Sequence, residues 1–318
     1  MKGLNLRLAK LNLILMDDRH KEILLRTMRD FMKFCDAAGL DWYLAFGASI
    51  GAVRHKGLIP WDDDIDVYMP RPDYERLLTM RGRVREIAGD ILEGEYDLCG
   101  PRVSEEDMPF SITKFCDMNS TIWEQERYPS VYGVFIDIFP LDSFDGNIAA
   151  AQRFKDEYHS AFRKYRRSFR RHTFRAWGES LLEGNFHYCS GALLDLLWYR
   201  PRRKSLKARF CSMDRALAAG RGDWRITYSA FSPAEKVSFP AGCICGRTLI
   251  PFENMMVPVP SGNDEILRRI YGDYMQMPAK FERISNHGSF FMDFTRRMTI
   301  TEIRCEIDNG FRDKYPNQ

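Results

Sequence analysis

Four aspartates stand within five residues in the segment Trp61-Asp-Asp-Asp-Ile-Asp-Val67, and their spacing could support metal-dependent chemistry. If the segment is extended, Asp64 and Asp66 project from one face, while Ile65 and Val67 enter the core. Carboxylates held side by side repel each other unless they share a proton or a cation lies between them, and a hard divalent cation is the usual solution. The alternative is a solvated turn, but a turn does not require apolar residues to alternate with the acids.

A third acid, Asp137, lies inside the apolar run Gly133-Val-Phe-Ile-Asp-Ile-Phe-Pro140. Such a run predicts a strand that is buried on both faces. Because burial of an unpaired carboxylate is costly, Asp137 needs a partner. A metal ion already held by Asp64 and Asp66 would supply one, and a buried Arg or Lys is the alternative.

A possible phosphate-binding turn, Gly47-Ala48-Ser49, lies upstream of the acidic segment. It joins a predicted strand at 42–46 to a predicted helix from Ala48 to about His55. Glycine lets the backbone approach a phosphate closely, and the first free N–H groups of a helix can bind it. A diphosphate bound to the metal would reach this turn.

Basic residues near these motifs could clamp the same diphosphate. Arg54, His55 and Lys56 end the predicted helix, where the alternative is a solvated C-terminus that favours cations anyway. Lys114 is the only cation of a second predicted strand, 111–117. We therefore expect a diphosphate- or nucleotide-binding set that comprises Gly47, Ala48, Ser49, Arg54, His55, Lys56 and Lys114.

Aromatic and acidic side chains flank the motifs and could form the pocket for the rest of a substrate. One group precedes the predicted acidic strand, and the other lies in a loop after residue 117. Their alternative role is to cover the core. The candidate pocket residues are Trp61, Asp62, Asp63, Trp123, Glu124 and Tyr128.

Regular elements that could position these residues follow from hydrophobic periodicity. Residues 17–38 predict an amphipathic helix that ends at Gly39, and a shorter helix is expected from Pro72 to about Met80. Residues 236–260 resemble a hairpin region. Ser261 with Asp264 then predicts the cap of a helix that ends near Gly272.

Residues 149–219 predict a basic helical region. Tyr158, Phe162, Tyr165 and Phe169 recur at helical spacing, which is typical of a core-facing stripe. The arginines at 163, 166, 167, 170 and 171 occupy other faces. They either face solvent or hold an anionic acceptor or the headgroups around a lipid-linked one.

Composition excludes several classes of protein. The 318 residues are 45% hydrophobic, and the net charge of +3 is too small to indicate a nucleic-acid partner. No run of about 18 apolar residues predicts a membrane span, and the first residues lack the apolar core and cleavage site of a secretory signal. We expect a cytoplasmic protein, at most peripheral at the inner face of the membrane.

The eight cysteines lack the spacing of a disulfide framework and should be reduced in that compartment. Only Cys243 and Cys245 form a close pair, and in a strand both would face one side. A zinc site needs more ligands, so this pair does not predict one.

The sequence resembles the LicD family, which includes the fukutin-like proteins. The motifs that carry the resemblance follow one another along most of the chain: GASIGAVRHKGLIPWDDDIDV, SITKFCD, GVFIDIFPLD, VPVP and YGDYMQMP. The family pattern more often has Thr-Leu-Leu at the positions of Ala48, Ser49 and Ile50, although Ser49 still supplies a hydroxyl. Asp273 and His287 occupy family-like positions without a role that the sequence defines.

The resemblance implies an α+β fold with a nucleotidyltransferase-like mixed sheet flanked by helices and a helical elaboration in the C-terminal half. It makes Asp64, Asp66 and Asp137 catalytic ligands of Mg²⁺, or of Mn²⁺. It also implies transfer of a substituted phosphate, such as phosphocholine from CDP-choline, to a hydroxyl of a cell-surface glycan or its precursor, with release of CMP. We expect one catalytic domain with a core at 1–145, the basic helical elaboration at 146–232, and a hairpin and helix at 233–318 that return to the core.

Three alternatives remain for the function. The donor could be another CDP-alcohol that carries ribitol, glycerol or ethanolamine. The chain could be a noncatalytic glycan- or membrane-binding protein, although that function has no use for three convergent carboxylates. It could also be a glycosyltransferase, which uses an Asp-x-Asp metal site but does not need the Gly-Ala-Ser turn or Asp137.

Overall fold

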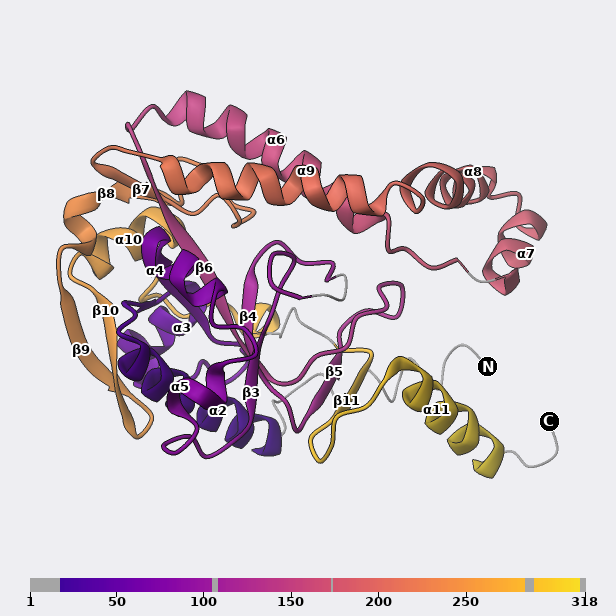
Figure 1. Cartoon of the computed structure of the whole chain (residues 1–318), viewed down its shortest axis with the longest axis horizontal. Coiled ribbons are helices and arrows are strands. Elements are labelled where there is room, and N and C mark those ends of the chain that lie inside the picture. The colour runs from indigo at the N-terminus through magenta and orange to yellow at the C-terminus, as the bar shows by residue number, and fades with distance from the viewer. Residues whose placement is uncertain (1–17, 105–107, 173, 284–288, 315–318) are drawn as a thin grey trace.

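A computed structural model describes residues 18–104, 108–172, 174–283 and 289–314 of the chain. Its centre is a seven-stranded mixed sheet (Figure 1). Five strands follow the order β1-β2-β6-β4-β3, and β6 extends beyond them to pair with β7, which pairs with β8. Only β2 and β6 are parallel; the other pairs of this sheet are antiparallel. The strands are β1 (Tyr43–Leu44), β2 (Asp66–Pro70), β3 (Tyr96–Cys99), β4 (Thr113–Asp117), β6 (Phe135–Phe144), β7 (Trp224–Ile226) and β8 (Ser238–Pro240).

The apolar run that predicted a doubly buried strand forms β6, which is the longest strand of the sheet. It begins at Phe135, two residues later than expected, and continues to Phe144 because β7 offers a second partner to its C-terminal end. The predicted strand at 42–46 is shorter, since Phe46 already begins a helix. The sequence thus located the central strand but not its full length.

Helix α2 (Asp18–Ala38) packs against the sheet through the face that its periodicity predicted. Phe31 and Phe34 both contact the ring of Phe115 on β4, with ring centroids 5.5 and 5.6 Å apart. Gly39 has a φ of +62°, which a residue with a side chain rarely adopts, and ends the helix as predicted. The neighbouring helices are α3 (Phe46–Ile50) with a π-helical turn at Gly51–His55, α4 (Arg71–Leu78) and α5 (Val84–Ala88).

The basic segment forms the helices that its composition predicted. Helix α6 (Ile148–Arg167) lies along α9 (Arg203–Ala216), as Figure 1 shows. The aromatic stripe of α6 is buried and packs on Phe210 of α9, so its interpretation as core is confirmed. Helices α7 (Phe174–Leu182) and α8 (Phe186–Leu194), a π-helical turn at Asp195–Tyr199, and a 3-10 turn at Leu217–Ala219 complete this region.

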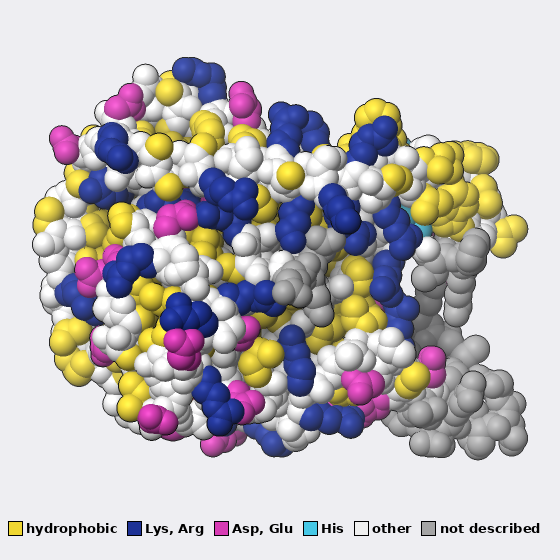
Figure 2. All heavy atoms as spheres, viewed as in Figure 1, with side chains coloured by type: hydrophobic (Ala, Val, Ile, Leu, Met, Phe, Trp, Pro, Cys, Tyr) yellow, Lys and Arg dark blue, Asp and Glu magenta, His cyan; other side chains and the backbone are white. Residues whose placement is uncertain are grey.

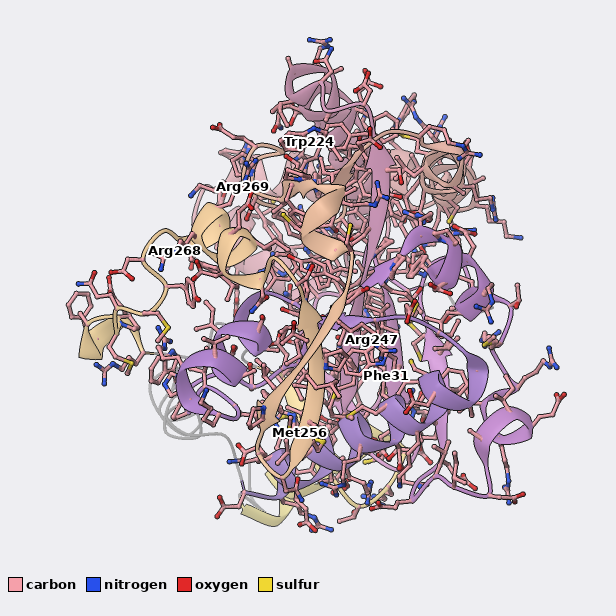
Figure 3. All side chains as sticks on the ribbon, turned by 90° about the vertical axis from the view of Figure 1, so that its left-hand side faces the viewer. Phe31, Trp224, Arg247, Met256, Arg268 and Arg269 are labelled. Carbon is pink, nitrogen blue, oxygen red and sulfur yellow. The ribbon has the colours of Figure 1, made fainter. Side chains whose placement is uncertain are left out.

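The predicted hairpin is confirmed as β9 (Arg247–Phe252) and β10 (Met255–Pro260), at the front of Figure 3. Helix α10 (Asn263–Tyr271) follows and ends at Gly272, as expected. Its N-cap is Gly262, however, and the hydroxyl of Ser261 instead donates to the carbonyl of Cys243, so the predicted cap is wrong. In Figure 3, Arg269 of α10 lies near Trp224, and its guanidinium is 5.5 Å from the centre of that ring.

Cys243 and Cys245 do not lie in a strand, the arrangement in which both would face one side. Residues Ala241–Ile244 form a 3-10 turn, in which Cys243 is buried and Cys245 is exposed. The two thiols therefore do not share a face. The remaining elements are β5 (Thr121–Trp123), β11 (Phe291–Asp293), a 3-10 turn at Lys280–Glu282 and α11 (Ile300–Lys314).

Among the described residues, no helix is long and apolar enough to cross a membrane. Residues 1–17, where a secretory signal would lie, are outside the described residues, and so is His287. Asp273 is exposed after α10.

Candidate active site

Strand register brings the predicted acids together. Asp66 begins β2, and the parallel pairing of β2 with β6 places it opposite Asp137. Asp64 lies two residues upstream, so its side chain shares the face of Asp66. Ligand oxygens of Asp64, Asp66 and Asp137 lie within 4.8 Å of one another. Asp62, Asp63 and Asp64 form a second group within the same limit, so Asp64 belongs to both.

Lys114 is the direct partner of Asp137. The antiparallel pairing of β4 with β6 places the two residues opposite each other, and the Lys114 ammonium donates to Oδ1 of Asp137 at 2.6 Å. The same ammonium lies 3.4 Å from the centre of the Phe135 ring. Asp137 thus has the buried cationic partner that was the alternative to a metal, while it also lies within reach of Asp64 and Asp66.

One lysine does not balance this group of acids. Desolvation and the nearby Asp64 and Asp137 carboxylates raise the pKa of Asp66 well above its usual range. Burial raises the pKa of Asp137 to about 6, although Lys114 opposes the shift. Among the described residues, none donates a hydrogen bond to the Asp66 side chain. The carboxylates of the cluster therefore repel one another, and a further cation would relieve this repulsion.

The donor set fits a hard divalent cation. It consists of carboxylate oxygens alone, which Mg²⁺ and Mn²⁺ prefer over nitrogen and sulfur. Lys114 occupies one oxygen of Asp137 and leaves the other oxygen for a second interaction. The residues present are thus chemically suited to the metal that the sequence predicted.

A cavity of about 520 Å³ opens beside the acids. Eight of the predicted site residues line it: Gly47, Asp62, Asp64, Asp66, Lys114, Glu124, Tyr128 and Asp137. This volume is within the range of small-molecule sites. The cavity joins the metal candidates to part of both the predicted phosphate set and the predicted pocket.

The rest of the predicted phosphate set does not line the cavity. Ala48 and Ser49 are buried in α3, and the Ser49 hydroxyl donates to Oδ1 of Asn263 at 2.8 Å. The Arg54 guanidinium donates to the carbonyls of Tyr274 and Gln276. These contacts join the turn region to α10 and the segment after it.

His55, Lys56 and Gly47 have different surroundings. Burial and the adjacent Arg54 lower the pKa of His55, and its ring contacts Trp61 edge to face. Lys56 adopts a left-handed backbone conformation, and its side chain is exposed. Gly47 lines the cavity so closely that a Cβ atom there would lie 2.5 Å from Oδ2 of Asp62. Glycine at this position therefore admits the Asp62 carboxylate.

Only some of the predicted pocket residues line the cavity. Glu124 and Tyr128 line the cavity, whereas Trp61, Asp63 and Trp123 do not. Trp123 is fully buried, and its indole N–H donates to the carbonyls of Gln125 and Tyr128. Its alternative role as a residue that covers the core is the one that the structure shows.

The motifs did not predict several of the cavity residues, because these residues lie far from the motifs along the chain. Phe162 and Arg166 reach the cavity from α6, Tyr271 reaches it from the end of α10, and residues 229–232 form another part of its wall. The Arg166 guanidinium lies 4.5 Å from the centre of the Tyr128 ring, and its buried Nε has no hydrogen-bond partner. The helical spacing that placed arginines around α6 did not indicate which one faces a cavity.

Comparisons with known proteins agree with the resemblance. Residues 39–175 match the family model described as LicD/FKTN/FKRP, nucleotidyltransferase domain. The chain is 25% identical over 270 residues to the lipopolysaccharide cholinephosphotransferase LicD of Haemophilus influenzae, across 81% of this chain and 90% of that protein.

Uncharacterized proteins of two Rickettsia species match a smaller part. The protein of Rickettsia typhi is 26% identical over 129 residues, which cover 35% of this chain and 42% of the relative. That of Rickettsia prowazekii is 23% identical over 128 residues, which cover 38% and 46%. The family match contains all three converging aspartates together with Gly47 and Lys114. Residues 39–175 of this chain are therefore similar to the nucleotidyltransferase domain of the LicD family.

Proposed function

We propose that this protein transfers phosphocholine from CDP-choline to a hydroxyl of a cell-surface glycan, such as lipopolysaccharide or its precursor, and releases CMP. The observation that carries the proposal is the convergence of Asp64, Asp66 and Asp137 at the wall of a substrate-sized cavity. The relative named as a lipopolysaccharide cholinephosphotransferase supports the choice of phosphocholine and of a glycan acceptor. The family match supports a nucleotidyltransferase-like fold for the catalytic core.

Asp64, Asp66 and Asp137 would hold Mg²⁺ or Mn²⁺, which supplies positive charge to the nonbridging oxygens and to the departing phosphate. Lys114 adds a permanent positive charge beside Asp137, since the Asp137 and Glu124 carboxylates raise its pKa although burial opposes this. The Gly47 backbone borders the same space and is the part of the predicted phosphate-binding turn that lines the cavity. We assign the donor diphosphate to this end of the cavity.

The reaction exchanges one P–O bond for another. The acceptor hydroxyl attacks the phosphorus that bears choline, and the bond from that phosphorus to the CMP oxygen breaks in line with the attack. The proton of the hydroxyl needs an acceptor at the acidic end. Asp137 is our candidate, because the oxygen that does not accept from Lys114 has two lone pairs, one for the metal and one for the hydroxyl proton.

Choline recognition would use the aromatic wall. A quaternary ammonium donates no hydrogen bond and is bound by ring faces and carboxylates. Glu124 adds a carboxylate to this wall. Two of its rings already face a cation, since the Lys114 ammonium lies 5.3 Å from the ring centres of both Phe110 and Tyr132. The aromatic residues that line the cavity are Phe46, Phe110, Tyr128, Tyr132, Phe139, Phe162, Phe231 and Tyr271.

We propose a cytoplasmic setting and a single catalytic domain built from the three predicted segments. All eight cysteines are free, which suits a reducing compartment. Strand β6 from the first segment pairs with β7 from the second, and β7 pairs with β8 from the third, which supports one folding unit. The same arrangement lets residues 229–232 complete the cavity of the core.

A donor panel tests the proposal. The purified full chain with Mg²⁺ should release CMP from CDP-choline faster than from CDP-ethanolamine, CDP-glycerol or CDP-ribitol, with water as a slow acceptor. Asp66→Asn should abolish the release, and the exposed Asp90→Asn is the matched control that should retain it. Preference for a polyol donor would redirect the assignment to another CDP-alcohol. Release from none of the four above the Asp66→Asn background, even with acceptor-containing cell extract, would overturn it and favour a test of sugar nucleotides.

A further inference from the structure

A helical arm exposes an unusual amount of apolar surface. It consists of α7, α8 and the π-helical turn at Asp195–Tyr199, and it extends away from the sheet beyond the ends of α6 and α9 (Figure 1). Eight of the nineteen exposed large hydrophobic side chains among the described residues lie within 181–198. Contiguous exposed apolar surface of this kind marks an interaction site. The eight are Leu181, Leu182, Phe186, Leu193, Leu194, Leu196, Leu197 and Trp198.

The exposure follows from an anchored helix with one unpartnered face. Phe186, Leu193 and Leu197 recur at i, i+7 and i+11 and therefore share a face of the continuous helix formed by α8 and the π-helical turn. On the other side, Asp195 is buried and accepts from the side chains of Arg167 and His172. These bonds attach the arm to α6, so its apolar face is directed outward by specific contacts.

Arginines surround the inner end of the apolar face. Arg171 and Arg200 have no carboxylate partner in the part of the chain that the structure describes. Burial and the nearby guanidinium groups of Arg304, Arg200 and Arg203 lower the pKa of Arg171, which shows that like charges are gathered there. Figure 2 shows yellow side chains over the outer part of the arm and dark-blue side chains between it and the body of the molecule. We call Arg171, Arg200, Arg203 and Arg304 the arginine collar. Its positive charge is complementary to an anionic partner.

The order of side chains along the arm matches the layers of a bilayer surface. Leu182 and Phe186, at 91% and 70% exposure, stand at the α7–α8 turn. Trp198 follows toward the body, and its ring stacks with the guanidinium of Arg202 at 3.7 Å. In a bilayer, apolar side chains contact the acyl chains, tryptophan lies at the interface, and arginine contacts the headgroup phosphates, so the order along the arm is the order of these layers. Glu183 at the turn restricts insertion to the headgroup boundary, where a carboxylate stays hydrated.

We propose that the arm docks the protein on an anionic lipid surface through residues 181–198, with Leu182, Phe186 and Leu197 inserted at the headgroup boundary and the arginine collar on lipid phosphates. Docking does not depend on the proposed transferase activity. One consequence does rest on that function: α6 carries both the arm and the cavity residues Phe162 and Arg166, so a docked arm holds the cavity beside the membrane. A lipid-anchored glycan acceptor could then reach the cavity without leaving the bilayer.

Vesicle binding of the full chain tests the docking. Wild-type protein should sediment with vesicles of phosphatidylcholine and phosphatidylglycerol, and less with phosphatidylcholine alone. Phe186→Ser/Leu197→Ser should lower partition into both by roughly tenfold or more. Arg171→Ser/Arg200→Ser should remove only the preference for anionic vesicles. The matched control, Leu249→Ser/Met256→Ser, removes two exposed apolar residues from the β9–β10 hairpin and should bind as the wild type does.

A second readout locates the contact and separates it from catalysis. Brominated lipids should quench tryptophan fluorescence, and Trp198→Phe should remove most of that quenching. CMP release with water as acceptor should be the same in the Phe186→Ser/Leu197→Ser variant as in the wild type. If both fail to release CMP yet differ in vesicle binding, the proposed function fails and the docking surface stands.

Three results would overturn the docking proposal. One is equal sedimentation of the arm variant and the hairpin control. Another is a wild-type dimer that ignores vesicles and becomes a monomer in the Phe186→Ser/Leu197→Ser variant, since this would assign the face to a second copy of the chain. The third is binding that persists in that variant and disappears when residues 1–17 are removed.

Discussion

Two groups of charged side chains flank the same strand, β6, and they are balanced very differently. In one, Arg71 donates to Asp142 at 2.6 and 3.2 Å and also to Asp214, while Arg102 donates to Glu75 and Asp214. Two guanidinium groups thus satisfy three carboxylates. This network joins α4, β6 and α9.

The other group lies five residues earlier on β6, at Asp137. Here Asp137 has Lys114, but Asp66 accepts no side-chain hydrogen bond from the described residues, and Asp64 lies within the same 4.8 Å group. Burial raises the pKa of Asp137 and of Asp142 alike to about 6, so the pKa does not separate the two groups. What separates them is pairing and access to the cavity. In the first group, which we call balanced, each of the three carboxylates accepts from at least one of the two guanidinium groups. A balanced buried network holds elements together, whereas an unbalanced one at a cavity is available for a ligand.

The largest expected difference concerns turnover. Asp64→Asn, Asp66→Asn or Asp137→Asn preserves shape but removes a charge that the proposed metal needs, so CMP release should fall by orders of magnitude. Without metal, Asp66→Asn should melt at the same temperature as the wild type or higher, because it relieves repulsion. Calorimetric melting in EDTA beside a CMP assay checks both. Loss of fold in Asp66→Asn would place this group with the structural network.

The balanced network should show the opposite pattern. Arg71→Met leaves Asp142 and part of Asp214 without a buried partner and should lower the free energy of unfolding by about 3–5 kcal/mol. Denaturant titration measures this loss. The CMP release per folded molecule should hold, and a decrease comparable to that of Asp66→Asn would contradict a purely structural role.

The far side of the cavity offers a smaller effect. Arg166 stacks on Tyr128 and has a buried Nε without a hydrogen-bond partner, so it is suited to an anionic group of the acceptor. Arg166→Gln should raise the KM for an anionic acceptor by roughly tenfold, because a charge-assisted hydrogen bond is lost. Release of CMP to water should be unaffected, and Arg163→Gln, which alters an exposed neighbour on α6, is the matched control. Equal acceptor KM values in the two variants would remove Arg166 from the site.

The smallest effect is the pH dependence of the metal-free protein. The raised pKa of Asp137 means that the folded chain binds its proton more tightly than the unfolded chain does. This contribution to stability is fully present below about pH 4 and is lost as the pH rises through about 6. In EDTA, the melting temperature should therefore decrease between pH 5 and 8. The decrease should be smaller in Asp66→Asn, and it should be suppressed when EDTA is replaced by Mg²⁺. An Mg²⁺-insensitive decrease, equal in both proteins, would assign it to Asp142.

The sequence was most informative where local pattern and chemistry coincide. The alternation at residues 64–67 and the lone acid in an apolar strand predicted the convergence of three aspartates, since a two-residue period and one strand pairing suffice for it. The aromatic stripe of α6 predicted its buried face for the same reason.

Long-range contacts were beyond such patterns. Ser49 was expected near a phosphate, yet its hydroxyl bonds to Asn263, and Arg54 bonds to carbonyls after α10. No local signal encodes a partner more than two hundred residues away. The same holds for residues 229–232 and Tyr271, which complete the cavity only through tertiary packing.

Cation binding tests the contrast between the two charged groups most directly. Free Mn²⁺ can be measured by its EPR signal in the presence of CDP-choline, with wild type, Asp66→Asn and Asp90→Asn at equal concentrations of folded protein. The wild type and Asp90→Asn should bind at least one Mn²⁺ each, and Asp66→Asn should bind it at least about tenfold more weakly. Equal binding by all three proteins, or no binding by the wild type, would contradict the assignment of Asp64, Asp66 and Asp137 as a metal site.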